Sequence, residues 1–195
     1  MNAIELTPEH PVEKVTQLAT SAEKVGFDTV FVSNHYNNRD PFLTLASIGE
    51  NTDSVQLGPG VVNPYECHPV RLASQMATLD EMIDGRGIFG IGAGDKSTLT
   101  NMGIERESPL RRVLESFRVA RKLWDGQTVK HRGTFQATDA SLNYEVGSIP
   151  VYVGAQGPQI PADSVSCHAG IQMVPALDRL VAWRLLAMTV FTHQP

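Results

Sequence analysis

The amino-acid sequence predicts an α/β protein with parallel strands that belong to a (β/α) barrel or to an open doubly wound sheet. Short β-rich runs alternate with amphipathic helical segments, which is the pattern of βαβ units. Successive strands arrive roughly 30 residues apart, the length of a strand plus a crossover helix. Only five or six strands can be counted, whereas an eight-stranded barrel takes about 250 residues. The count therefore predicts an incomplete barrel.

The first two strands and helices follow from periodicity and from helix-starting residues. Residues 3–6 form the first predicted strand and residues 29–32 the second. Between them a helix is predicted, with Pro11 near its start and Gly26 just past its end. Asp40-Pro41 caps and opens a second helix that runs to about residue 48. The first helix is indicated by six apolar residues at helical spacing: Val12, Val15, Leu18, Ala19, Ala22 and Val25.

The same alternation continues as far as residue 153. Three more strands are predicted, one beginning at residue 55 and the others at residues 87–92 and 149–153. Two full helices and a short helical turn separate them, at residues 69–83, 109–124 and 97–102.

Two segments break the alternation. Residues 126–147 are irregular, with strand-like pieces only at 134–136 and 142–144, so we expect an inserted loop or small hairpin there. In the tail, residues 171–174 look extended and residues 177–191 form an apolar, weakly patterned helix. We expect residues 1–158 to form the amino-terminal part of a (β/α) barrel and residues 159–195 to be an atypical tail, out of frame or disordered.

Composition excludes several classes of function. The net charge of −5 and the absence of a basic stripe argue against a nucleic-acid partner. No leader-like segment and no run of about 18 apolar residues occurs, so we expect a cytoplasmic protein and no membrane partner. Cys67 and Cys167 each precede a histidine, which is not the spacing of a metal-binding pair, and we expect no metal.

The most informative stretch is residues 57–65, Leu-Gly-Pro-Gly-Val-Val-Asn-Pro-Tyr, which leads from the third strand into an unusual backbone. Glycine permits close approach of a ligand, proline fixes φ, and Asn-Pro prevents a helix from starting. Glycine-rich runs also follow the next two strands, at residues 90–96 and 154–158. Because α/β proteins bind ligands at the carboxyl ends of their strands, these three runs predict one site.

Polar residues near these strand ends are candidates for chemistry. Asn34-His35-Tyr36 directly follows the second strand and suits a planar polar ligand, although a histidine there is more often a loop residue. Glu5 alternates with Ile4 and Leu6, so its carboxylate is directed to the opposite face, into a barrel interior or a site. Burial would raise its pKa and suit it to proton transfer, and a salt-bridged edge residue is the equal alternative.

The later glycine runs leave two interpretations open. Residues 90–95 match the first part of a dinucleotide fingerprint, but Asp95 stands in place of the last glycine. Asp95 and Lys96 either face the ligand or close a glycine turn with Asp95 as a helix N-cap. The run at 154–158 precedes an expected helix, and its free backbone N–H groups would attract a phosphate. Motifs of serine hydrolases, zincins and P-loop proteins are absent from the sequence.

Several of these motifs, in the same order, resemble the luciferase-like family of flavin and deazaflavin oxidoreductases. The resemblance covers residues 2–158 and is closest to the coenzyme F420-dependent reductases of 5,10-methylenetetrahydromethanopterin. It is carried by the strand with Glu5 and by residues 34–38, 57–65, 77–81, 90–96 and 152–158. Near Pro158 it stops, and residues 168–174 are only faintly similar to the next strand, which leads us to expect a truncated or frameshifted product.

The resemblance implies a TIM-like barrel that holds coenzyme F420 at the carboxyl ends of its strands, with a non-proline cis peptide at Gly60-Val61. It implies reversible hydride transfer from the reduced deazaflavin to the methylene carbon of a pterin substrate, in a homo-oligomer. The implied catalytic carboxylates are Glu5 and Asp95. Relatives often carry aspartate at the position of Asn34. The residues implied to bind the coenzyme are Asn34, His35, Gly60, Val61, Asn63, Gly92, Gly94 and, for its phosphate, Gln156 and Gly157.

Three alternatives remain open at this point. The motifs define the ring site better than the substrate site, so FMN could replace coenzyme F420. The chain could then be another luciferase-like oxidoreductase or monooxygenase. A barrel fragment that is inactive, or that only pairs with another chain, is the third possibility because missing strands leave unpaired sheet edges.

Overall fold

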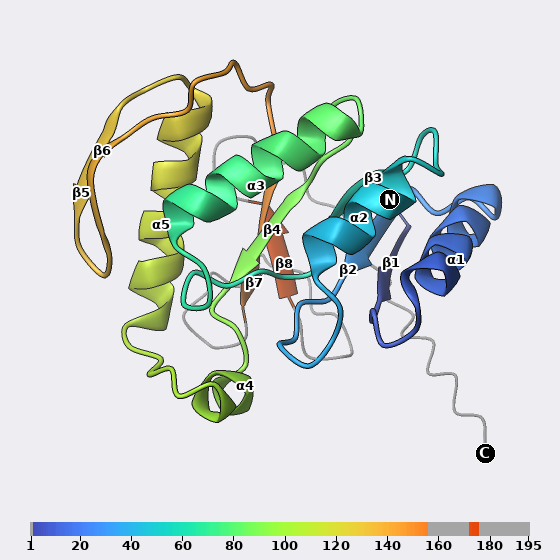
Figure 1. Ribbon diagram of the computed structural model, residues 1–195, viewed down its shortest axis with the longest axis horizontal. Helices are drawn as coiled ribbons and strands as arrows, with labels where there is room; N and C mark the ends of the chain where they lie inside the picture. Colours follow the sequence, from blue (N-terminus) through green and yellow to red (C-terminus); the bar gives the residue numbers. More distant parts are fainter. Residues whose placement is uncertain (1, 156–171, 176–195) are drawn as a thin grey trace.

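A computed structural model of the chain describes residues 2–155 and 172–175, and five parallel strands form its centre (Figure 1). Strands β1, β2 and β3 pair in that order, and β4 pairs with β7. Isolated parallel bridges, Leu57 with Gly87 and Val62 with Ile91, join β3 to β4. The parallel α/β architecture predicted from the sequence is therefore confirmed. The strands are β1 (Ala3–Leu6), β2 (Thr29–Val32), β3 (Gln56–Pro59), β4 (Phe89–Gly92) and β7 (Val151–Ala155).

Helices follow the strands as the alternation predicts. Asp40 accepts a hydrogen bond from the backbone N–H of Leu43 at 2.9 Å, which confirms it as the cap of α2. The observed bounds differ from the predicted ones by about two residues or less, the usual uncertainty of element ends. The helices are α1 (Val12–Lys24), α2 (Pro41–Gly49), α3 (Pro69–Met82), α4 (Lys96–Asn101) and α5 (Pro109–Trp124).

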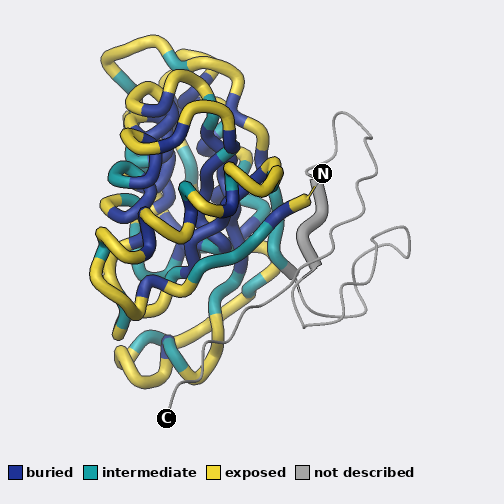
Figure 2. The backbone as a smooth tube through the Cα atoms, turned by 90° about the vertical axis from the view of Figure 1, so that its right-hand side faces the viewer, coloured by how far each residue is buried: buried dark blue, intermediate teal, exposed yellow. Residues whose placement is uncertain are grey.

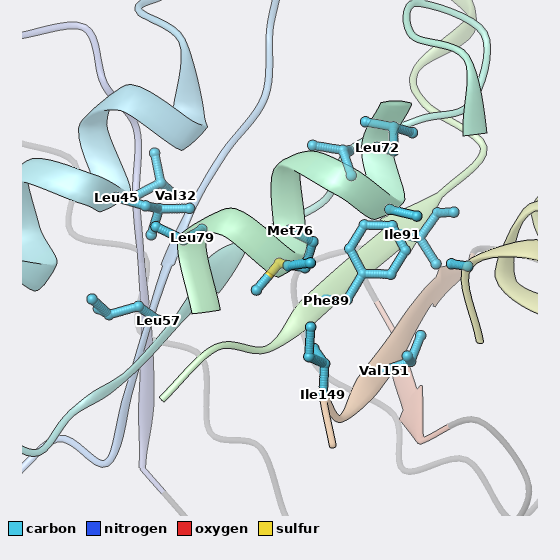
Figure 3. Packing of buried hydrophobic residues seen from close by; sticks show 14 of the residues in the cluster. Val32, Leu45, Leu57, Leu72, Met76, Leu79, Phe89, Ile91, Ile149 and Val151 are labelled. Carbon is cyan, nitrogen blue, oxygen red and sulfur yellow. The ribbon is translucent and has the colours of Figure 1, made fainter. Parts of the chain in front are cut away.

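The two faces of the strands differ in chemistry. One face packs against the helices and forms the main hydrophobic core, in which Leu72, Met76 and Leu79 of α3 lie over β3, β4 and β7 (Figure 3). The opposite face carries a smaller cluster of Ala3, Phe31 and Ile88, with Tyr152 packed against it. Buried backbone runs through the interior of the molecule, and exposed residues lie on its outer turns (Figure 2). The helix-covered face therefore holds most of the apolar side chains that stabilise the fold.

A bulge lies between the two bridges that join β3 to β4. Over this interval β3 contains one residue more than β4, which is the definition of a β-bulge. A Cβ on Gly58 would overlap the carbonyl oxygen of Ile88, and one on Gly90 would overlap that of Pro59. The glycines therefore permit the close approach of the two strands at this bulge.

The irregular segment before β7 forms the small hairpin that was expected. It consists of β5 (Val129–Arg132) and antiparallel β6 (Gln136–Ala140), which lie beside α5 in Figure 1. The prediction of strand-like pieces was wrong in detail, since Thr134 and Phe135 lie in the turn and residues 142–144 are outside any strand. Phe135 is buried because its ring packs against other side chains, so its apolar character does not indicate that it belongs to a strand.

A further strand, β8 (Gln172–Pro175), lies close to the extended segment expected at residues 171–174. It pairs with β7 in the antiparallel direction, whereas the next strand of a (β/α) barrel would be parallel. Extended character in a sequence sets no strand direction, so this difference could not be anticipated. The helix expected at residues 177–191 lies outside the described residues. None of the helices within them is long and apolar enough to cross a membrane.

Arg86 ties together the α2–β3 and α3–β4 connections at the amino ends of the strands. Its guanidinium group donates to the carbonyl oxygens of Ile83 and Val55 at 2.9 and 3.0 Å. It also donates to the carbonyl oxygen of Gly49 at 3.0 Å and to Thr52 Oγ1 at 3.2 Å. A single planar donor therefore satisfies the ends of α2 and α3 and the start of β3.

The substitution Arg86→Met should lower the free energy of unfolding by about 2–4 kcal/mol, because it leaves partly buried carbonyl groups without donors. Urea unfolding followed by circular dichroism measures this change. Arg118→Met removes the same charge from an exposed position on α5 and is the matched control. Equal stability of the two variants would contradict this role of Arg86.

Candidate active site

The carboxyl ends of β3, β4 and β7 meet around the side chain of Val61. The peptide bond between Gly60 and Val61 is cis, as the resemblance implied. A Cβ on Gly92 would lie 2.6 Å from Val61 Cγ2, and one on Gly154 would lie 2.9 Å from Val61 Cγ1. Gly92 and Gly154 are direct partners in the pairing of β4 with β7. Because neither residue has a side chain, Val61 can lie across both strand ends.

Glu5 lies on the face of the strands that is turned away from the helices. Its neighbours Ile4 and Leu6 pack against the main core, which confirms the predicted alternation. Its carboxyl carbon is 3.7 Å from where a Cβ on Gly60 would be. Desolvation by burial raises the pKa of Glu5 from 4.5 to about 7. Glu5 can therefore bind or release a proton near neutral pH.

Asn34 connects the loop after β2 to the loop after β3. Its Nδ2 donates to Glu66 Oε2 at 3.0 Å. The other oxygen of Glu66, Oε1, is buried and has no hydrogen-bond partner among the described residues. His35 and Tyr36 are exposed, and the carbonyl oxygen of His35 accepts from the backbone N–H of Asn38 at 2.9 Å in a turn.

Asn63 organises the loop after β3 from a buried position. Its Oδ1 accepts from the backbone N–H groups of Tyr65 and Glu66 at 3.1 and 3.0 Å, which forms an Asx turn. Gly94 has a positive φ of 70°, and a Cβ there would come within 3.0 Å of the Asn63 side chain. The loops after β3 and β4 therefore pack directly on each other.

Asp95 is the N-cap of α4. Its Oδ2 accepts from the backbone N–H of Thr98 at 2.8 Å and also from the hydroxyl of Ser97. The hydrogen bond from Ser97, and then those from Thr98, lower the pKa of Asp95 from 3.8 to about 2. Of the two interpretations of this residue, helix capping is the one that the structure shows for its side chain.

The structure brings most of the predicted site residues together in three groups. Glu5 lies beside Gly60, Val61 lies on Gly92 and Gly154, and Asn63 packs on Gly94. Gln156 and Gly157 lie outside the described residues. Within the described ranges, no group of three or more metal-ligating side chains is placed to hold a metal ion.

Sequence reasoning missed Glu66 and Arg112. Glu66 directly follows the Asn-Pro-Tyr of the third-strand motif, so a carboxylate next to a shaped loop was a signal that could have been used. Arg112 lies in the first turn of α5, and its contact with the loop after β3 depends on tertiary structure alone.

The chain matches a known protein family. The model of a family described as luciferase-like monooxygenase matches residues 2–164. The chain belongs to this luciferase-like family. The match extends six residues beyond Pro158, the residue near which the similar sequence motifs end.

Two curated relatives show how similar the chain is to individual proteins. The chain is 40% identical over 158 residues to 5,10-methylenetetrahydromethanopterin reductase of Archaeoglobus fulgidus, a match that covers 80% of this chain and 48% of the relative. It is 32% identical over 190 residues to F420-dependent glucose-6-phosphate dehydrogenase of Rhodococcus erythropolis, with 86% of this chain and 56% of the relative covered. The chain thus spans about half the length of the curated relatives that it matches.

A solved luciferase-like structure supports the fold. The coenzyme F420-dependent tetrahydromethanopterin reductase of Methanopyrus kandleri superposes with a TM-score of 0.75 at 34% identity. The superposition covers 80% of this chain and 50% of that one. The parallel strands described here therefore correspond to part of a luciferase-like barrel, as expected.

Replacing Glu5 by glutamine should flatten the dependence of stability on pH. The folded-state pKa of about 7 lies above the ordinary value of 4.5, so the proton stabilises the folded state fully below pH 4.5 and this contribution is lost as pH rises through about 7. Urea unfolding at several pH values should therefore show a decline across this window in the wild type. Glu5→Gln should reduce the decline, whereas the exposed control Glu9→Gln should keep it. A decline of the same size in Glu5→Gln would refute the assignment.

Proposed function

We propose that this chain binds coenzyme F420 and takes part in hydride transfer to 5,10-methylenetetrahydromethanopterin, giving the 5-methyl form reversibly. The observation that carries the proposal is Glu5, a partly buried carboxyl beside Gly60, whose pKa desolvation raises to about 7. The identity to the Archaeoglobus fulgidus reductase supports the choice of substrate.

Two features of the site fit a planar ring. Gly60, Gly92 and Gly154 bring no side chains of their own to the strand ends, and Val61 occupies the space that Cβ atoms on Gly92 and Gly154 would take, so a ring could lie against Val61. In addition, Ser33 Oγ, directly after β2, and Glu66 Oε1, in the loop after β3, are buried without partners among the described residues. Buried polar atoms without partners are costly, and polar groups of a bound molecule would reduce this cost.

The chain's own residues would hold the coenzyme and handle a proton. Coenzyme F420 in its reduced form supplies a hydride when it is bound. Val61 and the paired glycines would orient its ring, and Asn34 and His35 would contact its polar edge. The backbone N–H groups at Gln156 and Gly157 would bind its phosphate. Glu5, which keeps its proton up to about pH 7, would donate it to the bridge nitrogen whose bond to the methylene carbon breaks as that carbon receives the hydride. The proton that the coenzyme would release on oxidation would restore the protonated form of Glu5.

We assign this proton to Glu5 rather than to Asp95. At neutral pH Asp95 is ionised, because its pKa is lowered to about 2, and it holds no proton to donate. Its hydrogen bonds to Ser97 and Thr98 fix the start of α4 next to Gly94. Asp95 would therefore contribute a fixed negative charge at the edge of the substrate site.

The proposal is tested by mixing the purified 195-residue chain with reduced coenzyme F420 and methylene-tetrahydromethanopterin, and following the absorbance of the oxidised coenzyme. We expect saturable binding and turnover that falls as pH rises above about 7, where Glu5 loses its proton. Glu5→Gln should lower kcat by about 100-fold or more, the range typical of general acid catalysis. Glu9→Gln should behave as the wild type.

Other outcomes separate the alternatives. Binding of FMN in preference to coenzyme F420 would favour another luciferase-like oxidoreductase. Absence of binding for both compounds at millimolar concentration would refute the proposal and leave a barrel fragment without activity.

A further inference from the structure

The loop after β3, residues 60–66, is held from outside the strands by Arg112 of α5. The Nε of Arg112 donates to the carbonyl oxygen of Pro64 at 3.0 Å. Its guanidinium carbon lies 4.7 Å from the centroid of the Tyr65 ring, within the range of a cation–π contact. Both contacts fall immediately after Asn63, the residue that organises this loop. Arg112 thus holds the loop at Pro64 and Tyr65, on the carboxyl side of Asn63.

The same guanidinium group also reaches the hairpin. Its Nη1 donates to the carbonyl oxygen of Thr134 at 2.6 Å, in the turn between β5 and β6. Thr134 is itself fixed, because its backbone N–H and its hydroxyl both donate to Glu115 Oε2 at 2.8 Å. Arg112 therefore connects the loop after β3 to a turn that is bound to α5.

Side-chain packing holds this turn in place. Phe135 is buried, and its ring centroid lies 5.5 Å from that of His68 and 4.4 Å from that of His131. The Nε2 of His68 lies 2.9 Å from the carbonyl oxygen of Gln136, and its Nδ1 accepts from the backbone N–H of Val70 at the start of α3. The turn thus contacts α3, α5 and the loop after β3 together.

A second attachment holds Tyr65 from its other end. The Tyr65 hydroxyl donates to the carbonyl oxygen of Glu107 at 2.5 Å. One residue earlier, Arg106 Nε donates to the carbonyl oxygen of Ala93, in the loop after β4, at 3.2 Å. The segment that leads into α5 therefore contacts both loops that surround Val61.

We propose that Arg112 is a positioning residue: it fixes the loop of residues 60–66 between α5 and the β5-β6 hairpin, and through Val61 it sets the position of the coenzyme ring. This inference rests on the proposed function for the identity of the ring. Lysine could not replace Arg112, because an ammonium group cannot bond two carbonyl oxygens in a fixed fork and stack on Tyr65 at once. A role in stability alone would leave the loop and the coenzyme affinity unchanged in the folded protein.

The substitution Arg112→Met tests the inference, with Arg118→Met as the control because Arg118 is an exposed residue of the same helix. In the protein without coenzyme, the amides of Tyr65 and Glu66 should exchange with solvent about tenfold faster in Arg112→Met, measured by NMR under conditions where both variants are folded. The dissociation constant of coenzyme F420 should rise about tenfold, since small displacements of a positioning group are costly. The KM for the pterin should change by less than about twofold, and kcat should recover at saturating coenzyme.

A milder variant keeps the test decisive if Arg112→Met unfolds. Tyr65→Phe removes only the hydrogen bond to Glu107, and it should change exchange and affinity in the same direction by about threefold. Exchange rates or coenzyme affinities equal to those of Arg118→Met would overturn the role of Arg112. Failure of the wild type to bind coenzyme F420 would instead refute the proposed function. Faster amide exchange in Arg112→Met would then show that Arg112 positions the loop, and the part of the inference that concerns the coenzyme ring would be refuted.

Discussion

The lack of side chains at Gly92 and Gly154 is the constraint on which the site depends. These two residues face each other across β4 and β7, and Val61 occupies the space that their Cβ atoms would take. Val61 reaches this position because β3 contains a bulge relative to β4. A larger residue at either glycine would displace Val61, and the loop that carries Asn63 and Glu66 would move with it. Three strand ends therefore form one surface only with this set of small residues.

The two faces of the strands have different roles. On the helix side, Ile4 and Leu6 contribute to a continuous hydrophobic core that stabilises the fold. On the other side, Glu5 is partly buried beside Gly60, and desolvation raises its pKa to about 7. Burying a lone carboxyl opposes folding at neutral pH, and groups of this kind are concentrated at functional sites. The stability of the helix side allows this unfavourable group to be retained.

Much of this architecture could be predicted from the sequence, because it depends on local patterns. Strand and helix positions follow from periodicity, and the alternation around Glu5 correctly placed its carboxylate on the face away from the helices. Features that depend on tertiary contacts could not be predicted. The sequence does not distinguish Arg112 from the other arginines of α5, because its contacts with Pro64 and Thr134 arise only in the folded structure. Phe135 looks strand-like but lies in a turn, and the direction of β8 is not encoded in its extended sequence.

The central claim is that a planar coenzyme ring lies on the surface made by Val61 and the paired glycines. The most direct measurement is a crystal structure of the chain with oxidised coenzyme F420. We expect ring density in contact with Val61, next to Gly92 and Gly154, with the carboxyl group of Glu5 on the same face of the strands. Ring density at any other place on the chain, with these strand ends uncovered, would contradict it.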